Sequence, residues 1–113
     1  MTEADFRTLC LSFPETEAGT SYGHPSFKSF GKFLTRLRAE DNSVVIGCIG
    51  FDEREIMMEA DPETFHLTDH YRSYPYVLAR LERMNAQGLR ELLERQWRKN
   101  ATKRWLKTWD ASR

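Results

Sequence analysis

The sequence predicts a single α+β domain: an antiparallel sheet of about five strands, with an N-terminal and a C-terminal helix packed on one of its faces. The prediction rests on a helical apolar stripe near each end of the chain, on short β-branched and aromatic runs between the two stripes, and on turn residues that separate those runs. A chain of 113 residues can bury a core without a metal or a disulfide, so we expect one domain over residues 1–113.

The first helix is predicted to begin after Thr2, which can form a capping box with Asp5. The apolar positions that follow have the spacing i, i+3, i+4 and i+7 of one helix face: Phe6, Leu9, Cys10 and Phe13. Residues 15–25 are rich in turn formers and predict a loop.

Strands are expected over residues 26–30, 32–38, 44–49, 64–70 and 74–81, with a short helix over 52–60. Regular alternation in the second of these strands places Leu34 on the same side as Arg36 and Arg38. Gly47, inside the third strand, indicates a bulge or a close approach of the backbone to a neighbour.

The C-terminal segment is expected to form one long helix, which begins after Asn85 because asparagine is a favoured N-cap. Its apolar stripe returns every four residues, at Leu89, Leu93, Trp97, Ala101, Trp105 and Trp109. Tyr71, Tyr74 and Tyr76 form a second aromatic group, which we expect to pack in the sheet or the core.

The charges cancel overall but are unevenly distributed. The 17 basic and 17 acidic residues give a net charge of zero, which argues against a strong non-specific attraction to nucleic acid. Residues 52–69, however, hold seven acidic side chains and one basic, whereas residues 90–113 hold eight basic and three acidic. The sequence is therefore polarised in charge, and such an asymmetry is informative about the partners of the protein.

Two groups of cations are candidate phosphate contacts, one on or beside a hairpin around Gly31 and one on the C-terminal helix. A basic hairpin can touch the phosphate backbone, and a basic helix can pair with several phosphates. A solvated face remains an open alternative, because Lys and Arg also suit the negative end of any helix dipole. The candidate nucleic-acid-binding residues are Lys28, Lys32, Arg36, Arg38, Arg98, Lys99, Lys103 and Lys107.

Sequence signatures of catalysis and of metal binding are not found. Residues 19–23 (GTSYG) have the GxSxG spacing but lie in a predicted loop and not at a strand-to-helix turn, and the chain has neither a glycine-rich phosphate loop nor a CxxC pair. Cys10 and Cys48 each lie in an apolar setting that predicts burial. His66 and His70 are four residues apart, but in a predicted strand and without a third ligand. We therefore expect a protein that is not an enzyme, with no catalytic residues, no metal and no cofactor.

The N-terminus does not resemble a signal peptide, and no apolar run approaches the ~20 residues of a membrane span. We therefore expect a cytoplasmic monomer with no membrane partner.

Several segments resemble the MmcQ/YjbR family, in the family's order and over nearly the whole chain. Residues 24–28 (HPSFK) and 31–33 (GKF) resemble its HPxFK segment and the glycine–lysine segment that follows. Residues 62–65 resemble its PxxF segment, and residues 77–81, 89–93 and 97–98 resemble its next strand and closing helix. The resemblance implies a CyaY-like, frataxin-related fold with a double-wing arrangement of strands. It also implies DNA binding, with Lys28 and Lys32 as wing residues and Arg98 and Lys103 on the closing helix.

The expected function is therefore DNA binding through phosphate contacts, with little reading of the bases. The alternative is a non-enzymatic module that binds a protein or a small ligand. One version of this alternative is self-association between the acidic residues 52–63 and the basic C-terminus.

Overall fold

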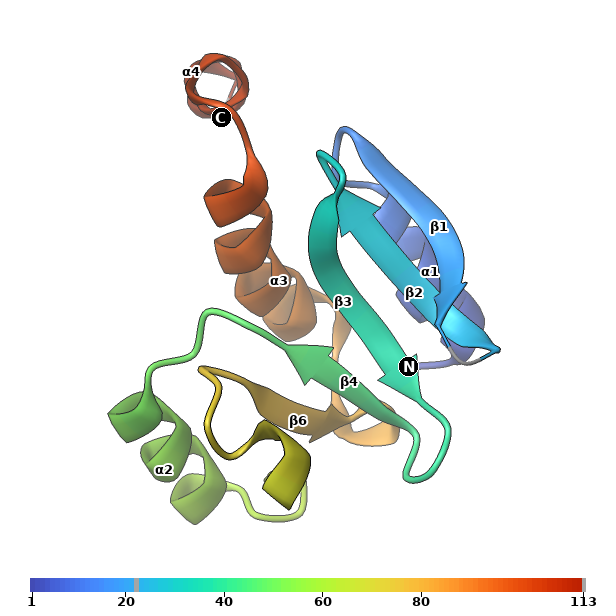
Figure 1. The fold of residues 1–113 in the computed structure, drawn as a ribbon, viewed down its shortest axis with the longest axis vertical. Coiled ribbons are helices and arrows are strands. Elements are labelled where there is room, and N and C mark those ends of the chain that lie inside the picture. Colours follow the sequence, from blue (N-terminus) through green and yellow to red (C-terminus); the bar gives the residue numbers. More distant parts are fainter. Residues whose placement is uncertain (22, 113) are drawn as a thin grey trace.

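The computed structural model describes residues 1–21 and 23–112, which Figure 1 traces from end to end. The main elements follow in the order α1 (Glu3–Leu11), β1 (Thr16–Ser21), β2 (His24–Ser29), β3 (Lys32–Arg38), β4 (Ser43–Ile46), α2 (Phe51–Ala60), β5 (Phe65–His66), β6 (Val77–Arg80), α3 (Ala86–Asn100) and α4 (Lys103–Ala111). Two short 3-10 helices, η1 (Asp69–Tyr71) and η2 (Leu81–Arg83), lie on either side of β6. The predicted α+β class, with a helix at each end, is confirmed.

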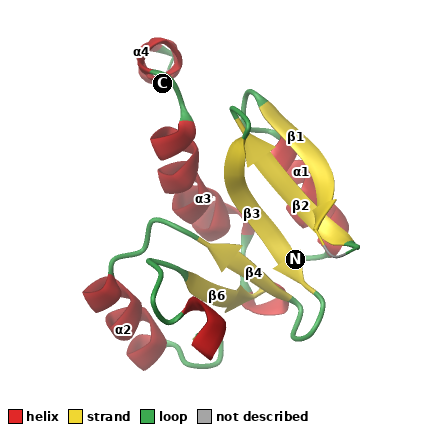
Figure 2. Ribbon diagram, viewed as in Figure 1, coloured by secondary structure: helices red, strands yellow, loops and turns green. Residues whose placement is uncertain are grey.

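The strands form one antiparallel sheet in the order β1-β2-β3-β4-β6-β5. α1 and α3 pack on one face, which we call the helix face, and the opposite face is the open face (Figure 2). The sheet has six strands rather than five, because residues 15–25, predicted as a loop, contain β1 and the start of β2. β1 is an edge strand of small and polar residues, so it lacks the apolar alternation that identifies a strand in a sequence.

The main core lies between the helix face and the two helices. Phe6 of α1 and Trp97 of α3 are both 0% exposed there, and Trp97 is the largest of the fully buried side chains. The indole N–H of Trp97 donates a hydrogen bond of 2.9 Å to the carbonyl of Pro14, which joins α3 to the segment that follows α1. The predicted capping box is confirmed, with hydrogen bonds of 3.0 and 3.1 Å between Thr2 and Asp5.

A shift in the register between β2 and β3 changes which side chains of β3 share a face. Phe27 pairs with Thr35, but the next residue of β2 pairs with Phe33, so Leu34 is an extra residue in β3. Such a bulge interrupts the alternation of the strand. Leu34 is therefore buried in the main core, and the prediction that it lies on the same side as Arg36 and Arg38 is wrong.

The strand predicted over residues 44–49 ends at Ile46, where the chain passes close to α3. A Cβ at Gly47 would overlap the side chains of Gln96 and Tyr76, which confirms the predicted close approach. Cys48 then adopts a left-handed φ of 59°, which takes the chain out of the sheet toward α2.

The long strands predicted over residues 64–70 and 74–81 are only partly formed, as the short β5 and β6. The irregular segment between them is held by Arg54 of α2, a side chain that is buried with 5% exposed. Its guanidinium donates hydrogen bonds of 2.8–3.4 Å to the carbonyl oxygens of Tyr71, Arg72, Tyr74 and Tyr76. These bonds satisfy carbonyls that no neighbouring strand reaches, so the segment is ordered without sheet pairing.

The segment held by Arg54 covers part of the open face. Tyr71 and Tyr76 pack over Val45 and Leu78, which are both 0% exposed, and form a second, smaller apolar cluster. Phe33 of β3 joins this cluster, with its ring 5.9 Å from that of Tyr76. β4 and β6 are thus buried on both faces, whereas β1 and β2 leave the open face uncovered (Figure 1).

The single C-terminal helix that the sequence predicts is two helices. α3 ends at Asn100, and Ala101 is extended with φ −70° and ψ 150°. The Thr102 hydroxyl then caps α4 by accepting a hydrogen bond from a backbone N–H of its first turn. Trp109 of α4 packs against Trp97 with 4.7 Å between ring centroids, so the apolar stripe folds back on the core instead of continuing along one axis.

We expect Arg54→Met to lower the free energy of unfolding by about 2–3 kcal/mol, because four carbonyls lose a charged donor. Urea denaturation followed by tryptophan fluorescence measures the change. Arg72→Met is the matched control, since that side chain is exposed and should alter stability by less than about 0.5 kcal/mol. Equal stability of the two variants would show that the Arg54 contacts contribute nothing.

The two thiols should differ sharply in reactivity. Burial raises the pKa of Cys10 to about 12, so almost none of it is thiolate at neutral pH, whereas Cys48 is only partly buried. We expect Ellman's reagent to modify Cys48 in the folded protein and to reach Cys10 only after denaturation. A folded Cys48→Ser variant that still reacts at the original rate would contradict this assignment.

Candidate nucleic-acid interface

The eight cations predicted from the sequence do not share one surface. Ser29 of β2 accepts a hydrogen bond from Asn100 of α3, so its cross-strand partner Lys32 lies on the helix face. Lys28 is one residue from Ser29 along the strand and therefore points to the open face. Arg36 and Arg38 also lie on the open face, where they contact Tyr71.

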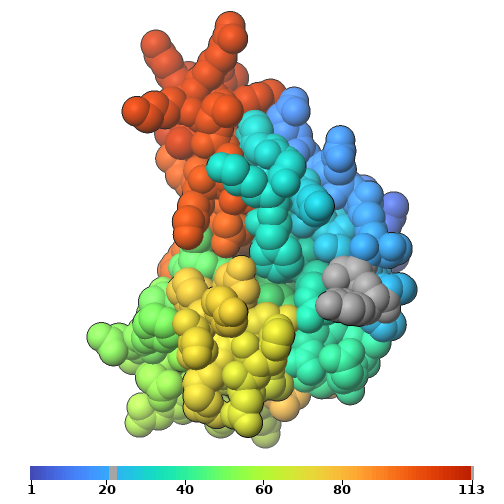
Figure 3. All heavy atoms as spheres, viewed as in Figure 1, coloured from blue at the N-terminus to red at the C-terminus, as the bar shows by residue number. Residues whose placement is uncertain are grey.

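One group of cations gathers where the turn between β2 and β3 meets the junction of α3 and α4. Asn100 donates a hydrogen bond of 2.8 Å to the carbonyl of Phe33, and the rings of Phe30 and Trp105 are 6.3 Å apart. These contacts bring the backbone of the turn against both helices, as the space-filling view also shows (Figure 3). We call the resulting surface the basic corner, and its exposed lysines are Lys32, Lys99, Lys103 and Lys107.

The lysines of the basic corner have no acidic partner. None of the four forms an ion pair with any residue of the described ranges 1–21 and 23–112. Lys103 and Lys107 lie on the outer side of α4, since Trp105, Leu106 and Trp109 are partly buried against the core and the β2–β3 turn. Their ammonium groups are therefore available to an anion in solution.

Two of the three arginines of the predicted set are engaged by carboxylates. Arg98 of α3 forms a bidentate pair with Asp110 of α4, at 2.8 and 3.0 Å, and this hydrogen bonding raises the pKa of Arg98. Arg38 pairs with Glu40 at 3.0 Å and lies 3.9 Å from Asp41. Both cations are largely neutralised, which makes them weaker candidates for phosphate than the lysines of the basic corner.

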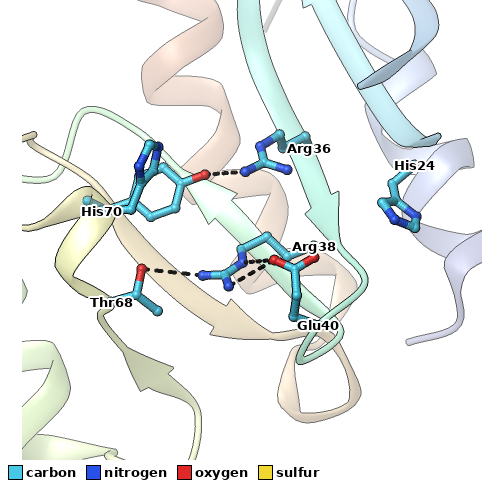
Figure 4. Close-up of a pocket in the computed structure, with 7 residues that line it drawn as sticks. His24, Arg36, Arg38, Glu40, Thr68 and His70 are labelled. Atoms are coloured by element: carbon cyan, nitrogen blue, oxygen red, sulfur yellow. Dashed lines mark hydrogen bonds and ion pairs between the residues drawn. The ribbon is translucent and has the colours of Figure 1, made fainter. Parts of the chain in front are cut away.

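The open face carries a separate groove of about 360 Å³ beside β3. In Figure 4, Arg36 and Arg38 extend from β3 toward the segment that carries Thr68 and His70, and His24 lies on the other side of the strand. We call this feature the open-face groove, and its lining is His24, Arg36, Arg38, Glu40, Thr68, His70 and Tyr71.

Sequence reasoning identified only the two arginines of this groove. His24 was expected in a turn, and Tyr71 was grouped with its neighbouring tyrosines as a packing residue, although its hydroxyl accepts a hydrogen bond from Arg36. The segment from Thr68 to Tyr71 was expected to be strand and turn rather than the wall of a groove. No local signal joins these residues, because they meet only when Arg54 places the segment over the sheet.

The two histidines considered as metal ligands separate in the fold. His66 lies in β5 with Nε2 2.8 Å from the Ser43 hydroxyl, whereas His70 lies in η1 and lines the groove. Among residues 1–21 and 23–112, we find no group of three or more His, Cys, Asp or Glu side chains placed to hold a metal ion. Within the same residues, every helix is too short or too polar to cross a lipid bilayer.

A protein-family model described as YjbR matches residues 11–99, from the end of α1 to the last turn of α3. No curated protein and no solved structure matches the chain. The match confirms the resemblance found in the sequence, while the CyaY-like relationship and the double-wing description stay predictions.

His66 should make stability depend on pH. Burial lowers its pKa, the Arg80 and Arg38 charges act in the same direction, and the Asp41 carboxylate 3.7 Å away only partly opposes them. The folded state therefore binds this proton less readily than the unfolded state does, so stability should fall as the pH drops below about 6.5.

We expect His66→Gln to show a shallower loss of unfolding free energy than the parent protein between about pH 7 and pH 5. Urea denaturation at a series of pH values measures both curves. Parallel curves, offset by a constant amount, would contradict the assignment.

Proposed function

The chain belongs to the YjbR family, and we propose that it binds the phosphate backbone of DNA through the basic corner. The observation that carries the proposal is the contact between the β2–β3 turn, beside which Lys32 lies, and the junction of α3 and α4, whose helices carry Lys99, Lys103 and Lys107. These lysines come from segments more than sixty residues apart in the sequence, yet all are exposed and none has a carboxylate partner in the described chain.

The distribution of acidic residues supports the same surface. α2 has Asp52 and Glu53 in its first turn and also carries Glu55 and Glu59, and it lies at the opposite end of the molecule from α4 (Figure 1). A duplex that approaches the basic corner therefore meets positive potential first, although the net charge of the chain is zero. The acidic end would be kept away from the phosphates.

The side chains involved favour contacts with phosphate over recognition of base sequence. Lysine is a compact charge on a flexible stem, and it lacks the planar fork with which arginine pairs to guanine. α4 is a short helix whose inner side is occupied by packing against the core and the β2–β3 turn, which leaves only its lysine-bearing side for a duplex. The proposed binding is therefore weak in sequence preference and strongly dependent on salt.

The test is the salt dependence of binding to a fluorescein-labelled DNA duplex, measured by fluorescence anisotropy. Each phosphate contact contributes about 0.9 to the slope of log K against log salt. We expect the double variant Lys32→Gln, Lys103→Gln to bind more weakly and to lower the slope by about 1.8.

The matched control is Arg7→Gln, Arg72→Gln, which removes the same charge from exposed positions outside the basic corner. The control should leave the slope unchanged. Binding that is insensitive to salt, or that falls equally in the two double variants, would refute the proposal.

A further inference from the structure

We infer that the open-face groove is a binding site for a small phosphate monoester, held chiefly by the guanidinium of Arg36. This site lies on a different face from Lys32, and the inference does not rest on DNA binding. The groove of about 360 Å³ falls in the range of pockets that hold small ligands. Its volume is larger than a bare phosphate ion would fill.

Arg36 is the central observation, because no carboxylate in the described ranges is in direct contact with its guanidinium. The side chain is partly buried, and it makes a hydrogen bond to the Tyr71 hydroxyl. It has no ion pair with any residue in the described ranges. A guanidinium has five N–H donors, so most of those on Arg36 are left for a ligand. A partly desolvated cation with free donors attracts an anion whose oxygens match its planar fork.

The surroundings of Arg36 divide the groove into two unlike parts. His70, whose ring is 4.7 Å from that of Tyr71, can donate a hydrogen bond to a remaining oxygen of a phosphate, which has more of them than a carboxylate. Arg38 is occupied by Glu40, and the Glu40 side chain is 64% exposed. The Glu40 end therefore repels the phosphate itself and accepts hydrogen bonds from hydroxyl groups on the organic part of the ligand.

The Tyr71 hydroxyl holds the Arg36 guanidinium in position before a ligand binds. Its ring is packed in the second apolar cluster, and its hydroxyl fixes the position of Arg36 at the edge of that cluster. A side chain held in this way loses less entropy when the ligand binds than a free surface arginine would. The same arrangement is not found at Lys28, which is exposed on the same face.

The experiment titrates the ¹⁵N-labelled protein with glycerol phosphate, inorganic phosphate and succinate, and follows amide chemical shifts. Glycerol phosphate should give saturable shifts over residues 36–40 and 68–71, inorganic phosphate should give weaker binding at the same residues, and succinate should bind least. Arg36→Gln should weaken glycerol phosphate binding at least tenfold, about the contribution of one charge-assisted pair.

Two further variants keep the test independent of folding. Tyr71→Phe keeps both charge and ring, and it should weaken binding by a smaller factor than Arg36→Gln. Lys28→Gln removes one positive charge from the open face outside the groove, and it should leave the affinity unchanged within about twofold. The variant Lys32→Gln, Lys103→Gln should still bind glycerol phosphate, which separates this site from the DNA proposal.

Three outcomes would overturn the inference. Shifts that do not saturate would indicate screening of surface charge only. Equal weakening by Lys28→Gln and Arg36→Gln, with both proteins folded by their amide spectra, would show that Arg36 has no special role. Succinate binding as tightly as glycerol phosphate would exclude phosphate as the group that the groove selects.

Discussion

The open face depends on one buried cation, Arg54. Its hydrogen bonds to four carbonyls hold the irregular segment 71–76 against the sheet. That segment supplies Tyr71, which in turn orients Arg36, so the chemistry of the groove depends on a side chain that does not line it. The Phe51 ring lies 4.9 Å from the Arg54 guanidinium and helps to shield it from solvent. Through Arg54, α2 thus fixes the position of the segment 71–76, which follows it in the chain.

The parts of the fold that the sequence predicted well are those with a strong local signal. The stripes of α1 and α3 have a periodicity that packing determines, the Asn85 side chain caps α3, and the short helix near residues 52–60 has an acidic first turn that suits the helix dipole. The errors lie where tertiary contacts override local pattern. β1 pairs through its backbone without an apolar face, and the break after Asn100 is fixed by a polar side chain that bonds to the β2–β3 turn.

The candidate site was predictable only in part, for a similar reason. Composition and position identified the lysines of the C-terminal segment as exposed cations, because charged residues off an apolar stripe must face solvent. Which cations meet is a property of the folded chain, since Lys28 and Lys32 point to opposite faces although they are four residues apart. Likewise, the carboxylates that engage Arg98 and Arg38 could be identified only from the fold.

Leu34, the extra residue in β3, affects the shape of the sheet as well as the strand itself. A bulge increases the twist of a strand and bends it, and β3 is visibly curved in Figure 1. Removing Leu34 or Thr35 would restore plain alternation and still leave the two arginines of β3 outside the core. The extra residue therefore adds twist and curvature to the part of β3 that borders the open-face groove, and a chain shortened by one residue here should have a flatter strand along that border.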